Sequence, residues 1–83
     1  MQKFNYHAPA ELYPSRRFAK SSQSLYRRFG TATDAIQHLM EELPSVAVAG
    51  AILEVDENRY DGAAIKRLYE STDYPLPRRD RAA

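Results

Sequence analysis

Residues 33–55 read TDAIQHLMEELPSVAVAGAILEV, and the two halves of this stretch decide which fold the chain can adopt. In the first half, apolar side chains recur at the i, i+3, i+4, i+7 spacing of an amphipathic helix: Ile36, Leu39, Met40 and Leu43. Thr31 or Thr33 can cap this helix, and Pro44 stops it because proline cannot continue the helical hydrogen bonds. We therefore predict a helix over residues 33–43.

The second half of the stretch predicts a strand. The apolar run 46–53 is rich in valine and other aliphatic residues, and it is followed by Glu54 and Val55. A run of this length and composition is typical of a largely buried strand, so we predict a strand over residues 49–55. A preceding strand, the helix and this strand would form a right-handed parallel crossover, with an antiparallel arrangement as the alternative.

The residues before the helix carry a repeated motif. Ser15–Phe29 reads SRRFAKSSQSLYRRF, with Arg-Arg-Phe near each end and a small polar segment between. The aromatic residues favour extended structure, so we predict a hairpin of two strands joined by a four-residue loop. Nearer the N-terminus, QKFNY alternates like a short strand, and the AEL segment between Pro9 and Pro14 suits a brief helical turn.

A second helix follows the turn-rich DEN segment. Asp61 is a natural N-cap for AAIKRLYES, in which Ala64, Ile65, Leu68 and Tyr69 share one side. Together these elements predict an α+β fold: a small two-layer sandwich in which two helices cover one face of a three- or four-stranded sheet, in the approximate order β-β-α-β-α. We expect residues 1–73 to form this single domain and residues 74–83, YPLPRRDRAA, to form an extended, partly mobile tail rich in proline and arginine.

The composition limits the class of protein. The chain has 83 residues, no cysteine and a net charge of +1, so a single domain without disulfide bonds or thiolate metal ligands is expected. No apolar run approaches the roughly 18 residues of a membrane span, and the N-terminus lacks the apolar segment of a signal peptide. We therefore expect a cytoplasmic protein without membrane contact.

The charges are segregated along the chain. Residues 1–30 carry a balance of +5, residues 31–73 a balance of −6, and residues 74–83 a balance of +2. Such segregation serves partner binding, or it reflects halves of one small fold that face each other.

Catalytic motifs are missing from the sequence. It contains no cysteine nucleophile, GxSxG elbow, phosphate-binding loop or dinucleotide fingerprint. A core this small also leaves little room for the roughly 300 Å³ cleft of a typical small-molecule site. We predict a protein that is not an enzyme, has no cofactor and takes no small-molecule substrate.

Two acidic segments contain residue types that ligate metals. Asp34, His38 and Glu42 share the polar face of the first predicted helix, although a solvated helix face is the favoured interpretation. The acidic residues from Glu54 to Asp61 lack the glycine and glutamate of an EF-hand and instead indicate a turn and a helix cap. We predict no metal site.

A sheet covered by helices on one face leaves its other face open. Arginine and tyrosine are enriched at the energetic centres of protein interfaces, and the segment 15–29 supplies four arginines and Tyr26. We predict a regulator or adaptor that contacts a protein partner or a second copy of itself through this face. The alternative is a nucleic-acid-binding protein that uses the basic hairpin 15–29 and the basic tail. The candidate contact residues are Arg16, Arg17, Lys20, Tyr26, Arg27, Arg28, Tyr74, Arg78 and Arg79.

Overall fold

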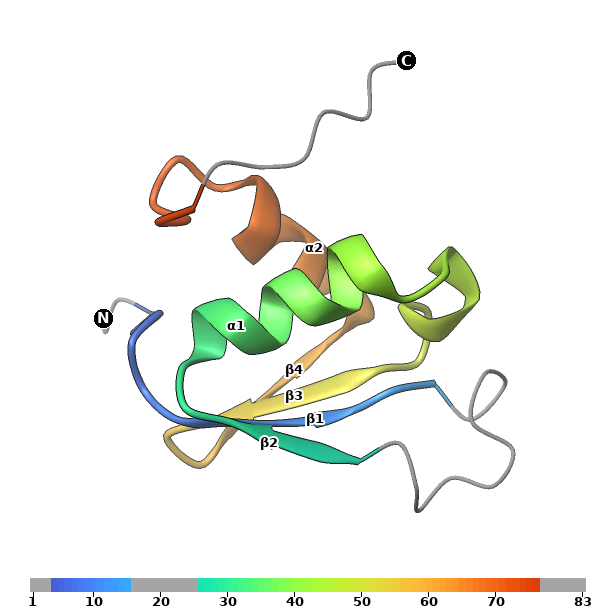
Figure 1. The fold of residues 1–83 in the computed structure, drawn as a ribbon, viewed down its shortest axis with the longest axis horizontal. Helices are drawn as coiled ribbons and strands as arrows, with labels where there is room; N and C mark the ends of the chain where they lie inside the picture. The colour runs from blue at the N-terminus through green and yellow to red at the C-terminus, as the bar shows by residue number, and fades with distance from the viewer. Residues whose placement is uncertain (1–3, 16–25, 77–83) are drawn as a thin grey trace.

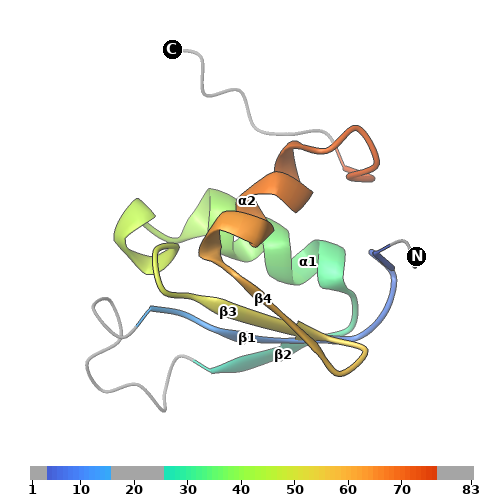
Figure 2. The same cartoon turned by 180° about the vertical axis from the view of Figure 1, so that it is seen from behind.

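The computed structural model describes residues 4–15 and 26–76. Within them, the elements in chain order are β1 (Ala10–Tyr13), β2 (Arg27–Phe29), α1 (Ala32–Gln37), the π-helical turn η2 (His38–Glu42), the 3-10 turn η3 (Ser45–Ala47), β3 (Ile52–Val55), β4 (Asn58–Asp61) and α2 (Gly62–Glu70). The four strands form one antiparallel sheet in the order β2-β1-β3-β4, and both helices lie over the same face (Figures 1 and 2). The predicted α+β sandwich is confirmed, with a fourth strand between β3 and α2.

The predicted crossover exists, but a third strand divides it. Both β2 and β3 pair antiparallel with β1, so β2 and β3 run in the same direction. The chain passes from β2 through α1 to β3, and β1 lies between the two strands. The strand–helix–strand unit therefore has two parallel strands, while every hydrogen-bonded pair in the sheet is antiparallel. The fold thus combines the parallel crossover and the antiparallel arrangement that the sequence left as alternatives.

The N-terminal assignments from sequence were wrong. The segment within QKFNY that the structure describes contains no strand, and residues 10–13, expected to form a helical turn, form β1, one of the two central strands. Ala10 and Leu12 are buried at 2% and 1% exposure while Glu11 and Tyr13 face the other way, which is the period of two of a strand. Because β1 is hydrogen-bonded on both sides, tertiary pairing overrides the local helical preference, and Pro9 stands just before the first paired residue.

The strand predicted over 15–20 lies, apart from Ser15, outside the described residues. Ser15 is buried, and its amide donates to the carbonyl oxygen of Ala47 at 3.0 Å. In the described part of the chain, the neighbour of β2 is β1, which pairs Phe29 with Ala10 and Arg27 with Leu12.

The first helix follows the prediction. Thr31 caps it, since its hydroxyl oxygen accepts from the amide of Asp34 at 3.1 Å, and Ile36 and Leu39 are fully buried. Thr33 has a different role: its hydroxyl donates to the carbonyl of Tyr6 at 2.9 Å and holds the N-terminal segment against the helix. The last turn widens into the π-helical η2, and the helical path ends before Pro44.

The strand predicted over 49–55 is shorter than expected. Only Ile52–Val55 is strand, and the residues before it form η3 and a turn that buries Ala47 and Ala51 in the core. Gly50 adopts a φ of 92°, a left-handed conformation that costs glycine little, and this turns the chain into β3. The apolar run therefore reflects two small buried alanines on a turn as well as a buried strand.

The fourth strand was missed because its turn lacks the usual residues. Asp56 and Glu57 form a two-residue turn between β3 and β4, with φ values of 52° and 68°. Hairpin turns with two left-handed residues normally use Asn-Gly or Asp-Gly, so Asp-Glu gave no hairpin signal. Asp61 ends β4 and caps α2 as predicted, with its carboxylate accepting from the amide of Ala64 at 2.9 Å.

The core lies between the two layers, and an aromatic cluster closes it at the β4 and α2 side. The largest fully buried side chains come from both layers: Leu12, Ile36, Leu39, Leu53, Val55 and Ile65. Edge-to-face ring contacts join Phe4 to Tyr6 and Tyr60, and Tyr74 to Tyr6 and Tyr69, with centroids 4.9–6.1 Å apart. The hydroxyl of Tyr6 donates to the carbonyl oxygen of Leu68 in α2 at 2.7 Å. Both ends of the described chain therefore pack on the helix side of the sheet.

We expect Gly62→Ala to destabilise the fold, because the added Cβ would collide with the backbone carbonyl oxygen of Val48. Relief requires the turn before β3 to move, and overpacking of this kind costs about 1–3 kcal/mol. Urea unfolding measures the loss. Gly30→Ala is the matched control, since a Cβ at that position would meet nothing within 4 Å beyond its own chain neighbours. An equal loss there would contradict this explanation.

We expect Glu57→Gly to stabilise the fold by about 0.5–1 kcal/mol, because glycine adopts the left-handed backbone of this turn without the clash of a Cβ. Thermal unfolding should show a rise of several degrees in Tm for a domain of this size. Arg67→Gly, on the exposed side of helix α2, should instead destabilise by about 1 kcal/mol. A lower Tm for Glu57→Gly would contradict the turn assignment.

Candidate functional site

The sheet face opposite the helices is the candidate site, and we call it the outer face. Directly paired residues of neighbouring strands point to the same side of a sheet, so the register defines which side chains lie there. One row across the four strands, the charged row, consists of Arg28, Glu11, Glu54 and Arg59. The next row, the tyrosine row, consists of Tyr26, Tyr13, Ile52 and Asp61.

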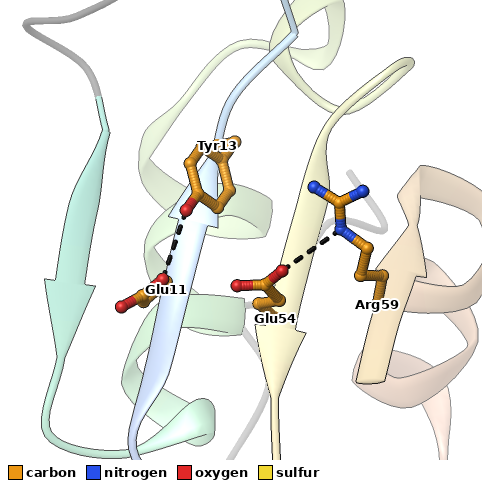
Figure 3. A network of polar contacts seen from close by, with 4 residues as sticks. All are labelled: Glu11, Tyr13, Glu54 and Arg59. Atoms are coloured by element: carbon orange, nitrogen blue, oxygen red, sulfur yellow. Dashed lines mark hydrogen bonds and ion pairs between the residues drawn. The ribbon is translucent and has the colours of Figure 1, made fainter. Parts of the chain in front are cut away.

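The charged row places two carboxylates at its centre and an arginine at each end. Glu11 and Glu54 are direct partners on β1 and β3, although like charges in such a pair repel. Arg28 Nε lies 3.6 Å from Glu11 Oε2. Arg59 Nε donates to Glu54 Oε2 at 3.2 Å, as Figure 3 shows. Each carboxylate is therefore paired with the arginine of the neighbouring edge strand.

The arginines remain accessible despite these ion pairs. Their side chains are 72% and 67% exposed for Arg28 and Arg59, against 32% and 33% for Glu11 and Glu54. Ion pairs this exposed contribute little to stability, about 0–1 kcal/mol each. The row is better suited to contact with a partner than to holding the fold together.

The tyrosine row adds apolar surface with polar tips. The rings of Tyr13 and Tyr26 lie 5.0 Å apart and are 37% and 40% exposed. The hydroxyl of Tyr13 donates to Glu11 Oε1 at 3.2 Å (Figure 3). Ile52 is half-buried on the neighbouring strand. These two tyrosines and Val46 are the exposed large hydrophobic residues of the described chain, so most of that exposure lies on this face.

Partial desolvation raises the pKa of Tyr13 and of Tyr26 above the ordinary value of 10.0. The Glu11 carboxylate raises both pKa values further, because a negative charge opposes formation of the phenolate. The two hydroxyls therefore remain neutral hydrogen-bond donors at physiological pH.

The described parts of the chain leave the outer face uncovered. Helices α1 and α2 lie on the opposite side of the sheet (Figures 1 and 2). Phe4 and Tyr6 pack there with Tyr74, so neither end of the described chain crosses the open side.

The structure places some of the candidate contact residues on the outer face and others elsewhere. Tyr26 and Arg28 lie on the outer face as expected. Arg27 lies on the other side of β2, where its guanidinium stands 5.0 Å from the ring centroid of Phe29. Tyr74 is a correction: it is only 6% exposed and packs in the aromatic cluster, because its ring fills the space between Tyr6 and Tyr69. The remaining candidates lie outside the described residues: Arg16, Arg17, Lys20, Arg78 and Arg79.

Six residues of the outer face were not among the sequence candidates: Glu11, Tyr13, Ile52, Glu54, Arg59 and Asp61. A signal for the first two was present, since Ala10 and Leu12 alternate with Glu11 and Tyr13 in the period of a strand. The flanking prolines favoured a helical turn and hid this alternation. Arg59 could not be placed without β4.

The metal-site hypothesis on the first helix finds no support in the geometry. His38 Nδ1 lies 3.4 Å from Glu42 Oε1, and the His38 ring contacts the Phe29 ring with centroids 5.5 Å apart and an interplanar angle of 42°. Among residues 4–15 and 26–76, no group of three metal-ligating side chains could hold an ion. The acidic segment near β4 forms a turn and a helix cap, as the sequence indicated.

The structure contains a groove on the helix side, although the short chain was expected to leave little room for a small-molecule cleft. It lies between the end of η2, η3 and the first turn of α2, and its volume is about 410 Å³. A chain of this length therefore does form a hollow of small-molecule size, contrary to the expectation. Its lining is mostly apolar: Met40, Leu43, Ser45, Val48, Ala49, Gly62, Ala63 and Lys66.

Comparison with protein-family models, with curated proteins and with solved structures gave no match to this chain. Of the helices in the described residues, none has the length and apolar character needed to cross a membrane.

We expect Glu11→Gln to lower the pKa of Tyr13 and of Tyr26 toward the ordinary tyrosine value, because it removes the carboxylate that disfavours both phenolates. A tyrosine NMR titration measures both values, with Tyr13→Phe to assign the resonances. Glu42→Gln, on the helix side, should leave them unchanged.

The same pKa shift has a consequence for stability. A tyrosine pKa that is higher in the folded than in the unfolded chain stabilises the fold below pH 10 and loses that effect as the pH rises further. Stability above pH 10 should therefore fall less steeply in Glu11→Gln than in the unchanged protein. Identical slopes in denaturant unfolding across that range would contradict the role of Glu11.

Proposed function

We propose that the protein is a small non-catalytic regulator or adaptor that binds another protein through its outer face. The observation that carries the proposal is the uncovered pair of exposed tyrosines, Tyr13 and Tyr26, beside the charged row. Tyrosine and arginine are enriched at interface hot spots, because each offers a large contact area together with hydrogen-bond donors.

The mixed charge of the face supports a protein partner over nucleic acid. Arg28 and Arg59 each face a carboxylate, and Glu11 and Glu54 lie side by side between them. A phosphate backbone drawn to the arginines would also approach two negative charges, which oppose its binding. A protein surface can match alternating charge, and such complementarity gives specificity.

The alternative of nucleic-acid binding rests on Arg27 and Arg28 of the predicted hairpin and on further basic residues that lie outside the described residues, namely Arg16, Arg17, Lys20, Arg78 and Arg79. We also propose a cytoplasmic location, where folds without disulfide bonds are usual, since the chain contains no cysteine.

We expect a photo-crosslinking amino acid at position 26 to give protein adducts in cells, because Tyr26 is exposed on the outer face. The same group at position 67, exposed on α2, is the control and should give few. The adducts at position 26 should resist nuclease and should disappear when Arg28→Glu and Arg59→Glu are combined with the probe. Lys66→Glu, a charge reversal on the helix side, should leave them in place.

Two results would count against the proposal. Adducts at position 26 that nuclease digests would replace it with the nucleic-acid alternative. Equal labelling from positions 26 and 67 would mean that the outer face binds no specific partner. Circular dichroism of each variant establishes that it is folded before the labelling is compared.

A further inference from the structure

We propose that the partner of the outer face is a second copy of this chain, packed face to face about a twofold axis that runs across the strands. This inference rests on the proposed function and adds the identity and the geometry of the partner. Its basis is the order of the side chains in the two rows, which the strand register determines.

The proposed axis lies in the interface, perpendicular to the strands and midway between the two rows. It places the charged row of one copy over the tyrosine row of the other. Arg28 then faces Tyr26, Glu11 faces Tyr13, Glu54 faces Ile52 and Arg59 faces Asp61, and every pairing occurs twice because the interface is symmetric.

Three of these four pairings are chemically complementary. An arginine over a tyrosine ring forms a cation–π contact. The Tyr13 hydroxyl, which donates to Glu11 of its own chain at 3.2 Å, can donate to Glu11 of the second copy in its place. Arg59 meets Oδ2 of the Asp61 carboxylate as an ion pair, since Oδ1 already accepts from the amide of Ala64 at 2.9 Å as the cap of α2. Glu54, which faces Ile52, keeps its own bond to Arg59 at 3.2 Å.

The charges disfavour two other symmetric arrangements. A twofold axis parallel to the strands, through the middle of the sheet, would place the charged row of one copy over the charged row of the other, with the strand order reversed. Arg28 would then face Arg59, and Glu11 would face Glu54, so every contact in the row would be repulsive. An axis along the charged row itself would place each charged residue opposite the same residue of the other chain, so like charges would meet. The axis between the rows avoids both conflicts, and it does so over all four strands.

The face is small, which sets the expected affinity. Its four strands stand about 4.8 Å apart and contribute two rows, so the buried area falls at the low end for protein interfaces. We therefore expect a reversible dimer with a Kd of roughly 10–100 µM, in which Tyr13, Tyr26 and Ile52 supply the buried apolar surface.

Sedimentation equilibrium of the full chain tests the proposal. The unchanged protein should associate to a dimer, and Arg59→Glu should raise the Kd at least tenfold because it sets a second negative charge against Asp61 at both symmetric contacts. Arg67→Glu makes the same charge change on the exposed side of α2 and should alter the Kd less than twofold. A protein that stays monomeric at ten times the expected Kd overturns the inference, as does a dimer that Arg59→Glu does not weaken.

Cross-linking provides a second test that does not depend on the folding of Arg59→Glu. The chain has no cysteine, so single cysteines can be introduced cleanly. Packed sheets lie about 10 Å apart, which a short bis-maleimide reagent spans. A mixture of Ile52→Cys and Glu54→Cys chains should cross-link as a mixed pair. Cross-linking of Glu11→Cys to Glu54→Cys in its place would establish the axis parallel to the strands and overturn the proposed one.

The failure of this inference can be distinguished from the failure of the proposed function. An adduct at position 26 with twice the mass of the chain supports both. An adduct with a different protein, together with a monomeric chain in solution, removes only the second copy as partner. Absence of any specific adduct at position 26 removes both.

Discussion

The sheet depends on β1, a strand of four residues that is hydrogen-bonded on both sides. It joins β2 to β3, which the chain itself connects only through α1, so without it the strand–helix–strand unit would have no continuous sheet beneath it. Ala10 and Leu12 contribute its buried side, and Glu11 and Tyr13 its open side. The same short segment therefore forms the centre of the core layer and the centre of the outer face.

A direct pair of glutamates at the centre of a sheet is an unusual feature for a small domain. Glu11 and Glu54 repel each other, and the flanking arginines offset this only at an exposed surface where ion pairs are weak. Cross-strand pairs of β-branched or aromatic residues at these positions would stabilise the sheet more. The pair therefore adds little to stability, and the proposed function is based on this row and on the tyrosines beside it.

The aromatic cluster has a complementary role on the other side of the sheet. Phe4, Tyr6, Tyr60, Tyr69 and Tyr74 bring together both ends of the described chain, β4 and α2. In a domain this short, the burial of several aromatic rings is a large part of the apolar surface removed from water. Because these rings hold the ends on the helix side, they also keep them away from the outer face.

The sequence by itself determined both helices and the cap at Asp61, and it limited the cap of the first helix to Thr31 or Thr33. The spacing of Ile36 and Leu39, the caps at Thr31 and Asp61 and the stop at Pro44 are local signals, in which the interacting residues lie within a few positions of each other. It also indicated the buried end of β3 and the open sheet face. Only the tertiary structure decided that residues 10–13 form a strand, that Asp56 and Glu57 form a hairpin turn, and that Tyr74 belongs to the core. The physical reason is that a strand gains its hydrogen bonds from partners far away in sequence. The rows of the outer face, which combine residues from 11 to 61, therefore exist only once the register is set.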